Sequence, residues 1–431
     1  MSSGCSWWRK RTTTQQRASG FRAPRTGTEW GGRATRAEIN LDAIASNVSA
    51  LSRHVAPAAL MAVVKADGYG HGAVMIAQTS LAAGASMLGV YTAGEGTELR
   101  RGGIEAPILV FGPLATGELD DIWEYRLTPT ITDIGRAEAL SEHAAGRTLP
   151  IHVKLDTGLS RAGVAPRDAL PLLEKLAELP SLAVDGVYSH FASADEPDTS
   201  STLRQLRIFR EILESLQRHG HTFEVKHISN SAASLNFPEA HLDMIRAGIS
   251  TYGYYPSESV KRSVRLMPAL SLLSVVTRVH SIPAGAGVGY GHEFRASRES
   301  MIALVPIGYG DGLPRSLGNG RGHLLIRGKA APIVGRVSMD QITADVTDIG
   351  DVALGDEVVI IGSQDGAEQS ADIVARQAGT ISYDILTGLM PRIPRVYTRS
   401  DGSAWVLRHS SHLEPLAGDS VPAEQSSGLS T

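Results

Sequence analysis

The stretch Leu60–Gly72, LMAVVKADGYGHG, decides the fold. Leu60–Val64 is a short unbroken apolar run, which is typical of a strand buried on both faces of a parallel sheet. The run stops at Lys65 and passes directly into a loop with glycine at alternate positions from Gly68 to Gly72. Burial at the mouth of such a pocket disfavours the charged form of a lysine and lowers its pKa. The stretch therefore predicts a neutral amine, available for a Schiff base or for proton transfer. A lysine that merely leaves the core for water has the same local pattern.

Seven further apolar runs follow this one, with helical stretches such as 168–179 and 203–219 between them. Gly, Pro or Asp punctuates the joins. Eight β/α units over ~210 residues fit a TIM barrel, in which chemistry belongs at the carboxyl ends of the strands. We therefore predict an α/β fold, with an N-terminal TIM (β/α)8 barrel over residues 37–270 that opens with a helix over 38–55 capped by Asp42. The expected strands are Leu60–Val64, Met87–Tyr91, Ile108–Phe111, Leu127–Ile131, Ile151–Leu155, Val184–Phe191, Val225–Ile228 and Met244–Ile249.

The pattern of predicted elements changes after Pro268, where strand-like segments follow one another without intervening helices. We predict a mostly antiparallel β-domain over residues 271–410, followed by a flexible tail over 411–431 that is rich in Ser, Gly and Pro. The expected segments are strands at 270–280, 301–307, 324–326, 333–337, 342–346 and 357–361, and one short helix at 373–378.

The composition is that of an ordinary two-domain protein of 431 residues. No apolar run approaches the ~18 residues that a membrane span requires. Outside the first 36 residues the chain is strongly acidic, which argues against a nucleic-acid partner. The single cysteine, Cys5, allows neither an intrachain disulfide nor a cysteine metal site. We expect a cytoplasmic protein without a metal.

Residues 1–36 form a basic leader that lacks the apolar core of a secretory signal. Its Arg-rich, Ser/Thr-rich and acid-poor composition is similar to that of an organelle transit peptide. A disordered tail, or a start codon assigned too far upstream, gives the same composition. All three interpretations stay open.

The string AVVKADGYGHG closely resembles the signature of the alanine racemases around the lysine that carries pyridoxal phosphate (PLP). The resemblance covers about residues 36–400. It implies an isomerase that interconverts L- and D-alanine, a precursor of the cell wall, in a homodimer whose active sites are shared between subunits. By resemblance Lys65 holds the cofactor and serves as one catalytic base. Tyr69 and Tyr383 match family tyrosines near the cofactor phosphate and the inner gate of the site.

The string KLDTGLSRAG over 154–163 resembles the family segment that contains a carbamylated lysine in many members. The same segment carries an arginine on the cofactor's phenolic oxygen and beside the substrate. By resemblance Lys154 and Arg161 take those roles. A guanidinium is always charged and stabilises a phenolate, and a carbamate would fix its orientation. Without the resemblance, the string reads as a solvated loop.

Two later strand ends carry further candidates for cofactor contacts. By resemblance His190 would stack on the pyridine ring and Asp195 would lie in the access channel. A lone histidine at a strand end is otherwise a core residue. The strand-to-helix turn at Asn230 and Ser231 offers backbone amides and a hydroxyl, which suit a phosphate. By resemblance Ser231 binds the PLP phosphate, a role compatible with its capping a helix, and Asn230 and the amides of Gly248 and Ile249 complete the set.

Arg246, in the string RAGISTYG, is the most diagnostic residue. The resemblance places an arginine rather than a carboxylate on the pyridine nitrogen, supported by His227. Because arginine keeps its proton at neutral pH, the ring nitrogen would stay unprotonated. A weaker electron sink favours simple reprotonation, which indicates a racemase rather than a decarboxylase on the same fold.

Tyr290, in the string VGYG, is by resemblance the second catalytic base, supplied by the partner subunit. Racemisation needs one acid or base on each face of a planar intermediate, and Lys65 with the partner's Tyr290 would provide them. A tyrosine between glycines is otherwise a packing residue at a turn. The remaining family positions are Met339 and Asp340 near the substrate carboxylate, and Tyr309, Arg315 and Arg336 in the access channel.

Two other functions stay open. A serine or broad-specificity amino-acid racemase would use the same catalytic parts, because one methylene or hydroxyl discriminates weakly. A PLP-binding protein without turnover would leave Tyr290 and the β-domain unexplained. The segments TAGEGTELRRGG (92–103) and TISYDILTGLMPRIPRVY (380–397) depart from the family pattern, although neither is expected to touch a catalytic residue.

Overall fold

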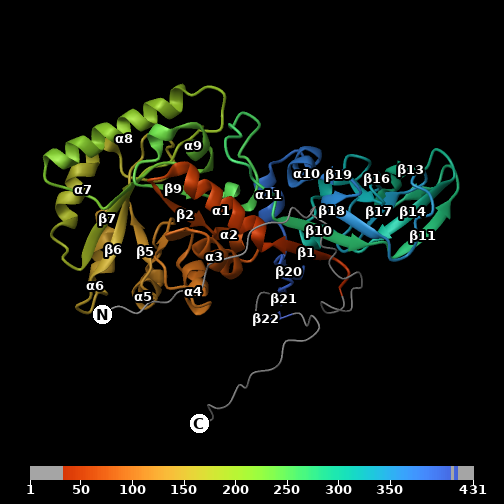
Figure 1. Ribbon diagram of the computed structural model, residues 1–431, viewed down its shortest axis with the longest axis horizontal. Coiled ribbons are helices and arrows are strands. Elements are labelled where there is room, and N and C mark those ends of the chain that lie inside the picture. The colour runs from red at the N-terminus through yellow and green to blue at the C-terminus, as the bar shows by residue number, and fades with distance from the viewer. Residues whose placement is uncertain (1–32, 409–411, 416–431) are drawn as a thin grey trace, which may run out of the picture.

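The computed structural model describes residues 33–408 and 412–415, and Figure 1 shows two parts side by side. In the first part, all eight predicted runs form one parallel sheet in the order β8-β7-β6-β5-β4-β3-β2-β9. Its ends meet where Asp243 N donates to Lys226 O at 3.1 Å and Arg246 N donates to Ser229 O at 3.0 Å. This sheet confirms the predicted barrel. The strands are β2 Ala59–Val63, β3 Met87–Val90, β4 Ile108–Val110, β5 Thr128–Ile131, β6 Leu149–Lys154, β7 Leu182–Tyr188, β8 Val225–His227 and β9 Met244–Ala247.

Helices cover the outside of the barrel (Figure 1). In the longest of them, α8, the buried residues Leu206, Phe209, Ile212 and Leu216 recur at helical spacing and face the sheet. Burial of this apolar stripe explains why a helix forms between β7 and β8. The helices of this part are α1 Leu41–Val55, α2 Lys65–Tyr69, α3 Ala73–Ala82, α4 Ala93–Arg101, α5 Leu119–Glu124, α6 Ile134–Glu142, α7 Ala169–Leu176, α8 Ser200–Arg218 and α9 Ser231–Asn236.

The second part is a mostly antiparallel sheet, as the sequence predicted, in the order β11-β14-β17-β16-β15-β18-β10-β1-β20-β21-β22, where β1 is Arg36–Asn40. Two helices, α10 Ala371–Ala378 and α11 Ser382–Thr387, pack beside it, and α11 lies at the junction with the barrel (Figure 1). The strands are β10 Leu270–Val275, β11 Arg278–Ile282, β12 Gly287–Val288, β13 Phe294–Arg295, β14 Ser300–Val305, β15 His323–Ile326, β16 Lys329–Val334, β17 Ile342–Asp345, β18 Glu357–Gln364, β19 Ala367–Gln369, β20 Arg395–Thr398, β21 Ala404–Arg408 and β22 His412–Pro415.

The start of the expected first helix is wrong. Strand β1, Arg36–Asn40, pairs antiparallel with β10 and parallel with β20, so the second sheet contains residues from both ends of the chain. The helix begins only at Leu41, and Asn40 rather than Asp42 caps it by accepting from Ala43 N at 3.0 Å. A five-residue strand gives too short an alternation to be distinguished from a helix start.

The expected boundaries at residues 36 and 410 also differ from the observed elements. Within the leader, Arg33 pairs with Asp311 at 2.6 Å and Thr35 donates to Pro306 O at 2.7 Å, so these residues pack on the second sheet. At the other end, β22 lies inside the expected tail. The predictions for residues 1–32 lie outside the described part. Among residues 33–408 and 412–415, no helix has the length and hydropathy to cross a bilayer.

Candidate active site

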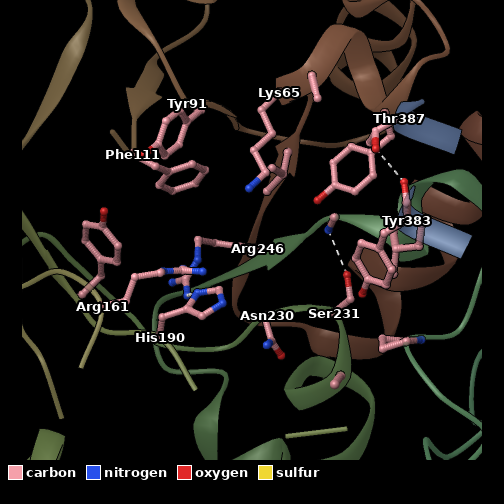
Figure 2. A pocket seen from close by; sticks show the side chains of 18 of the residues that line it. Lys65, Tyr91, Phe111, Arg161, His190, Asn230, Ser231, Arg246, Tyr383 and Thr387 are labelled. Atoms are coloured by element: carbon pink, nitrogen blue, oxygen red, sulfur yellow. Dashed lines mark hydrogen bonds between the residues drawn. The ribbon is translucent and has the colours of Figure 1, made fainter. Parts of the chain in front are cut away.

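A cavity of about 620 Å³ opens at the carboxyl ends of the barrel strands, where the sequence placed the chemistry. Arg161, Arg246 and His190 lie at one end of it, Ser231 and Tyr383 lie at the other, and Lys65 points in from above (Figure 2). The predicted residues that line it are Lys65, Tyr69, Lys154, Arg161, His190, Asp195, Asn230, Ser231, Arg246, Gly248, Ile249 and Tyr383.

Lys65 lies two residues after the end of β2 and begins a turn with left-handed backbone. The φ values are 53° at Ala66, 53° at Asp67 and 52° at Tyr69, a conformation that costs a residue with a side chain roughly 1–2 kcal/mol. Contacts on both sides maintain it. Glu95 accepts from Ala66 N at 2.7 Å, and Arg395 of the second part donates to Gly70 O at 3.2 Å. The direction of Lys65 is therefore set by tertiary contacts on two sides of the turn.

The two lysines of the cavity are both poor bases for their type. Burial, together with the nearby Arg161, lowers the pKa of the Lys65 amine, and Glu95 opposes this shift. Burial followed by Arg161 and Arg246 lowers the pKa of Lys154 to about 8. The lowered pKa increases the neutral fraction of each amine, and the neutral form is the one that covalent chemistry at nitrogen requires.

Arg246, on β9, is the centre of a buried hydrogen-bond network. Its Nη1 donates to His227 Nδ1 at 2.8 Å, and its Nη2 donates to Ser189 O and Ile228 O at 2.9 Å. The same Nη2 lies 3.1 Å from His190 Nδ1. Burial lowers the pKa of Arg246 to about 10, so the guanidinium stays charged at neutral pH. The network fixes a cation at one end of the cavity.

Hydroxyl groups and a backbone amide converge at the opposite end. Asn230 caps α9 by accepting from Ala233 N at 3.0 Å, so the expected capping role of Ser231 is wrong and its hydroxyl is available to the cavity. Gly248 N donates to Ser231 Oγ at 2.9 Å (Figure 2). A Cβ at residue 248 would lie 2.8 Å from the Tyr69 hydroxyl and 3.7 Å from Ser231 Oγ. Glycine keeps the space between these hydroxyls open.

Apart from Tyr383, the predicted residues of the second domain do not line this cavity. The Tyr290 side chain is 70% exposed and Met339 is 53% exposed. Asp340 pairs with Arg392 at 2.8 Å. The remaining three are the access-channel candidates: the Arg315 guanidinium lies 5.8 Å from the ring centroid of Tyr309, and Arg336 pairs with Glu293. Within a single chain, Lys65 therefore lacks the phenol that was predicted to face it.

Several cavity residues were not predicted from the sequence. An aromatic wall is formed by Tyr91, Phe111 and Tyr188, which lie at the ends of β3, β4 and β7. They could have been predicted, because the active site of a TIM barrel lies at the carboxyl ends of its strands. Glu95 belongs to the segment 92–103, which was not expected to touch a catalytic residue. Glu95 accepts from the backbone amide of Ala66, so the segment contacts the turn that begins at Lys65 without bonding to that side chain. The additional lining also includes Val63, Ala66, Pro113, Ala162, Ala232, Pro256 and Thr387.

Comparison with known proteins identifies the same two parts. The chain matches the family model for the alanine racemase N-terminal domain over residues 39–256 and the model for the C-terminal domain over residues 269–397. It is 44% identical to an alanine racemase of Desulfosudis oleivorans over 382 residues, which is 85% of this chain and 97% of the relative. It is 40% identical to an alanine racemase of Clostridium tetani, over 86% of this chain and 97% of that one.

Solved structures agree with this assignment. The alanine racemase of Clostridium difficile superposes with a TM-score of 0.83 at 33% identity, over 87% of this chain and 98% of that one. The alanine racemase of Bacillus anthracis, solved with bound L-Ala-P, gives a TM-score of 0.83 at 36% identity, over 88% and 98% of the two chains. Both identity and coverage are high enough to show homology along nearly the whole described chain. The chain therefore belongs to the alanine racemase family, a family of isomerases.

Proposed function

We propose that this protein is an alanine racemase that interconverts L- and D-alanine with PLP held in the barrel cavity. The observation that carries the proposal is the Arg246 guanidinium, fixed by His227 at the end of a cavity that Lys65 enters. A PLP ring nitrogen beside a permanent cation stays unprotonated, which favours returning a proton to the α-carbon over other fates. The alanine racemases are known as PLP-dependent enzymes, and the printed names of the relatives agree with the substrate.

The residues present fit the cofactor. The open space at Gly248, between the hydroxyls of Tyr69 and Ser231, would hold the phosphate. Arg161 would meet the phenolic oxygen, and Lys65 would hold the aldehyde carbon. Each group of the cofactor thus has a partner of suitable chemistry along one cavity.

PLP supplies an aldehyde for the substrate's amino group and an aromatic ring that delocalises charge from the α-carbon. The lowered pKa of Lys65 lets this amine accept the α-proton on one face. The contacts of Arg246 with two histidines hold that side chain in place, and its pKa of about 10 keeps it charged at neutral pH. The rings of Tyr91, Phe111 and Tyr188 line one side of the cavity.

We further propose that Tyr290 of a second chain supplies the opposite acid or base, so that the working form is a homodimer. The exposed Tyr290 and Met339 support this, because tyrosine and methionine are enriched in protein interfaces. We place the enzyme in the cytoplasm, since a chain with a single cysteine needs no oxidising compartment.

Two measurements test the proposal. Borohydride reduction followed by peptide mass spectrometry should find PLP attached at Lys65 and nowhere in Lys65→Ala. Chiral chromatography should show formation of D-alanine after incubation with L-alanine. The yield of D-serine after incubation with L-serine measures how broad the substrate specificity is. Attached PLP without interconversion of either amino acid would leave a cofactor-binding protein without turnover and contradict the proposed activity.

A further inference from the structure

The hydroxyl of Ser231 has a second, unassigned partner behind the cavity wall. Besides Gly248 N, the Ser250 hydroxyl donates to Ser231 Oγ at 3.0 Å. Ser250 N also points at this oxygen, at 3.5 Å. Ser250 is fully buried and does not line the cavity. It therefore touches the site only through Ser231.

This arrangement fixes the direction in which the Ser231 hydroxyl donates its proton. A serine hydroxyl has one proton to donate and two lone pairs that accept. The Gly248 amide and the Ser250 hydroxyl occupy the two accepting positions of Ser231. The Ser231 proton must then point away from both, towards the cavity that Ser231 lines. If Ser250 accepted instead, this proton would be turned away from the cavity.

We propose that Ser250 is a positioning residue that makes Ser231 a donor to a phosphate monoester in the cavity. The residue would thereby set the preference of the site for phosphorylated over unphosphorylated pyridoxal. The dianion of a phosphate monoester has no proton to offer, so a hydroxyl binds it well only when it is oriented as a donor. This inference rests on the proposed function, because PLP is the phosphate monoester concerned.

The chain contains a matched control for this hydroxyl. Ser234 is also fully buried and also bonds to residue 231, but its Oγ donates to the Ser231 carbonyl at 2.8 Å. Ser234→Ala removes a buried hydroxyl of equal size from the same cluster and leaves the polarity of the Ser231 side chain unchanged. Ser250→Cys replaces the hydroxyl, a strong donor, with a somewhat larger thiol that is a weak donor.

The test compares PLP with pyridoxal, which lacks the phosphate. Dissociation constants for both ligands are measured by titrating cofactor-stripped full-length protein and following absorbance. Loss of one well-placed hydrogen bond should weaken PLP binding about five- to tenfold in Ser250→Ala, with pyridoxal binding changed by less than about twofold. Ser250→Cys should also weaken PLP binding more than pyridoxal binding. Ser234→Ala should keep the wild-type ratio of the two dissociation constants.

The outcomes separate this inference from the function on which it rests. A wild-type preference for PLP that persists undiminished in both Ser250 variants would overturn the role of Ser250 alone. An equal loss of PLP and pyridoxal affinity would show that Ser250 only supports packing, and would also overturn it. A wild-type protein that binds PLP no more tightly than pyridoxal would overturn both the inference and the proposed cofactor.

Discussion

The Nη1 group of Arg246 lies 2.8 Å from Nδ1 of His227, and this contact fixes the protonation state of the histidine. Arginine can only donate, so His227 Nδ1 carries no proton and the neutral ring holds its proton on Nε2. That nitrogen faces His152 Nδ1 at 3.0 Å. A chain of neutral imidazoles therefore extends from the cavity into the interior of the barrel.

Acid should destabilise the protein through these rings. Burial lowers the pKa of His152 from 6.5 to about 4, and burial with Arg246 takes that of His227 well below its ordinary value. Below pH 6.5 the unfolded chain binds more protons than the folded one, so stability should decline as pH falls from 6.5 to about 4. For His152 the full effect is roughly 3 kcal/mol. Urea unfolding at a series of pH values measures it.

His152→Gln should flatten this decline, whereas His219→Gln, at an exposed helix end, should not. Identical pH dependence in the wild type and in His152→Gln would show that this ring does not carry the acid sensitivity.

Lys154 should be carbamylated. Its pKa of about 8 leaves part of the amine neutral near physiological pH, and only the neutral amine reacts with carbon dioxide. Incubation with 13C-bicarbonate should give a carbamate NMR signal that grows as pH rises towards 8 and that Lys154→Ala lacks. Absence of the signal at every pH would leave Lys154 as a free amine, with Arg161 oriented by other contacts.

Glu95 should govern the charge of Lys65. Its carboxylate accepts from Ala66 N at 2.7 Å and from Tyr91 N at 2.6 Å, and its negative charge raises the pKa of Lys65 against the effect of burial. Glu95→Gln should therefore lower the pKa of Lys65 further. The pH dependence of Lys65 modification by an amine reagent, followed by peptide mass spectrometry in cofactor-free protein, measures the change.

Glu98→Gln is the matched control, because Glu98 is exposed on the same helix. An equal shift in the two variants would mean that the charge of the helix as a whole, and not the Glu95 contact, acts on Lys65.

The glycine at 70 should be intolerant of a side chain. A Cβ there would lie 2.1 Å from Leu386 O on the second part, and its φ is +77°. Gly103 has a similar φ of +81° with nothing within 4 Å. Gly103→Ala should thus cost only the backbone strain of about 1–2 kcal/mol. Gly70→Ala should cost about 1–3 kcal/mol more from the clash and should displace Lys65, lowering racemisation. Chemical unfolding measures the stability of both variants, and an activity assay measures racemisation. An equal loss of stability in Gly70→Ala and Gly103→Ala would contradict the close contact at Gly70.

Much of the barrel was predictable because its signal is local. Each buried parallel strand is a short apolar run, and the fold rule then places the residue after the run at one end of the barrel. Lys65, Lys154 and Ser231 are far apart in sequence, yet they line one cavity for this reason. The roles assigned to them remain predictions.

The features that the sequence did not predict depend on distant contacts. Strand β1 pairs with strands more than 200 residues away, so five residues could not reveal its sheet. The left-handed turn after Lys65 exists because Arg395 and Leu386 pack against it. His152 lies within strand β6, and its ring fits there because its neighbour on β7, Gly186, has no side chain. None of these relationships has a local pattern.

The central claim is that two chains complete each active site, with Lys65 from one and Tyr290 from the other. Lys65→Ala and Tyr290→Phe should each be nearly inactive alone. When the two variants are unfolded together and refolded as a mixture, half of the dimers should be mixed, and each of these should contain one intact site. The account predicts recovery of about a quarter of the wild-type racemisation rate. A mixture as inactive as its two components would contradict it.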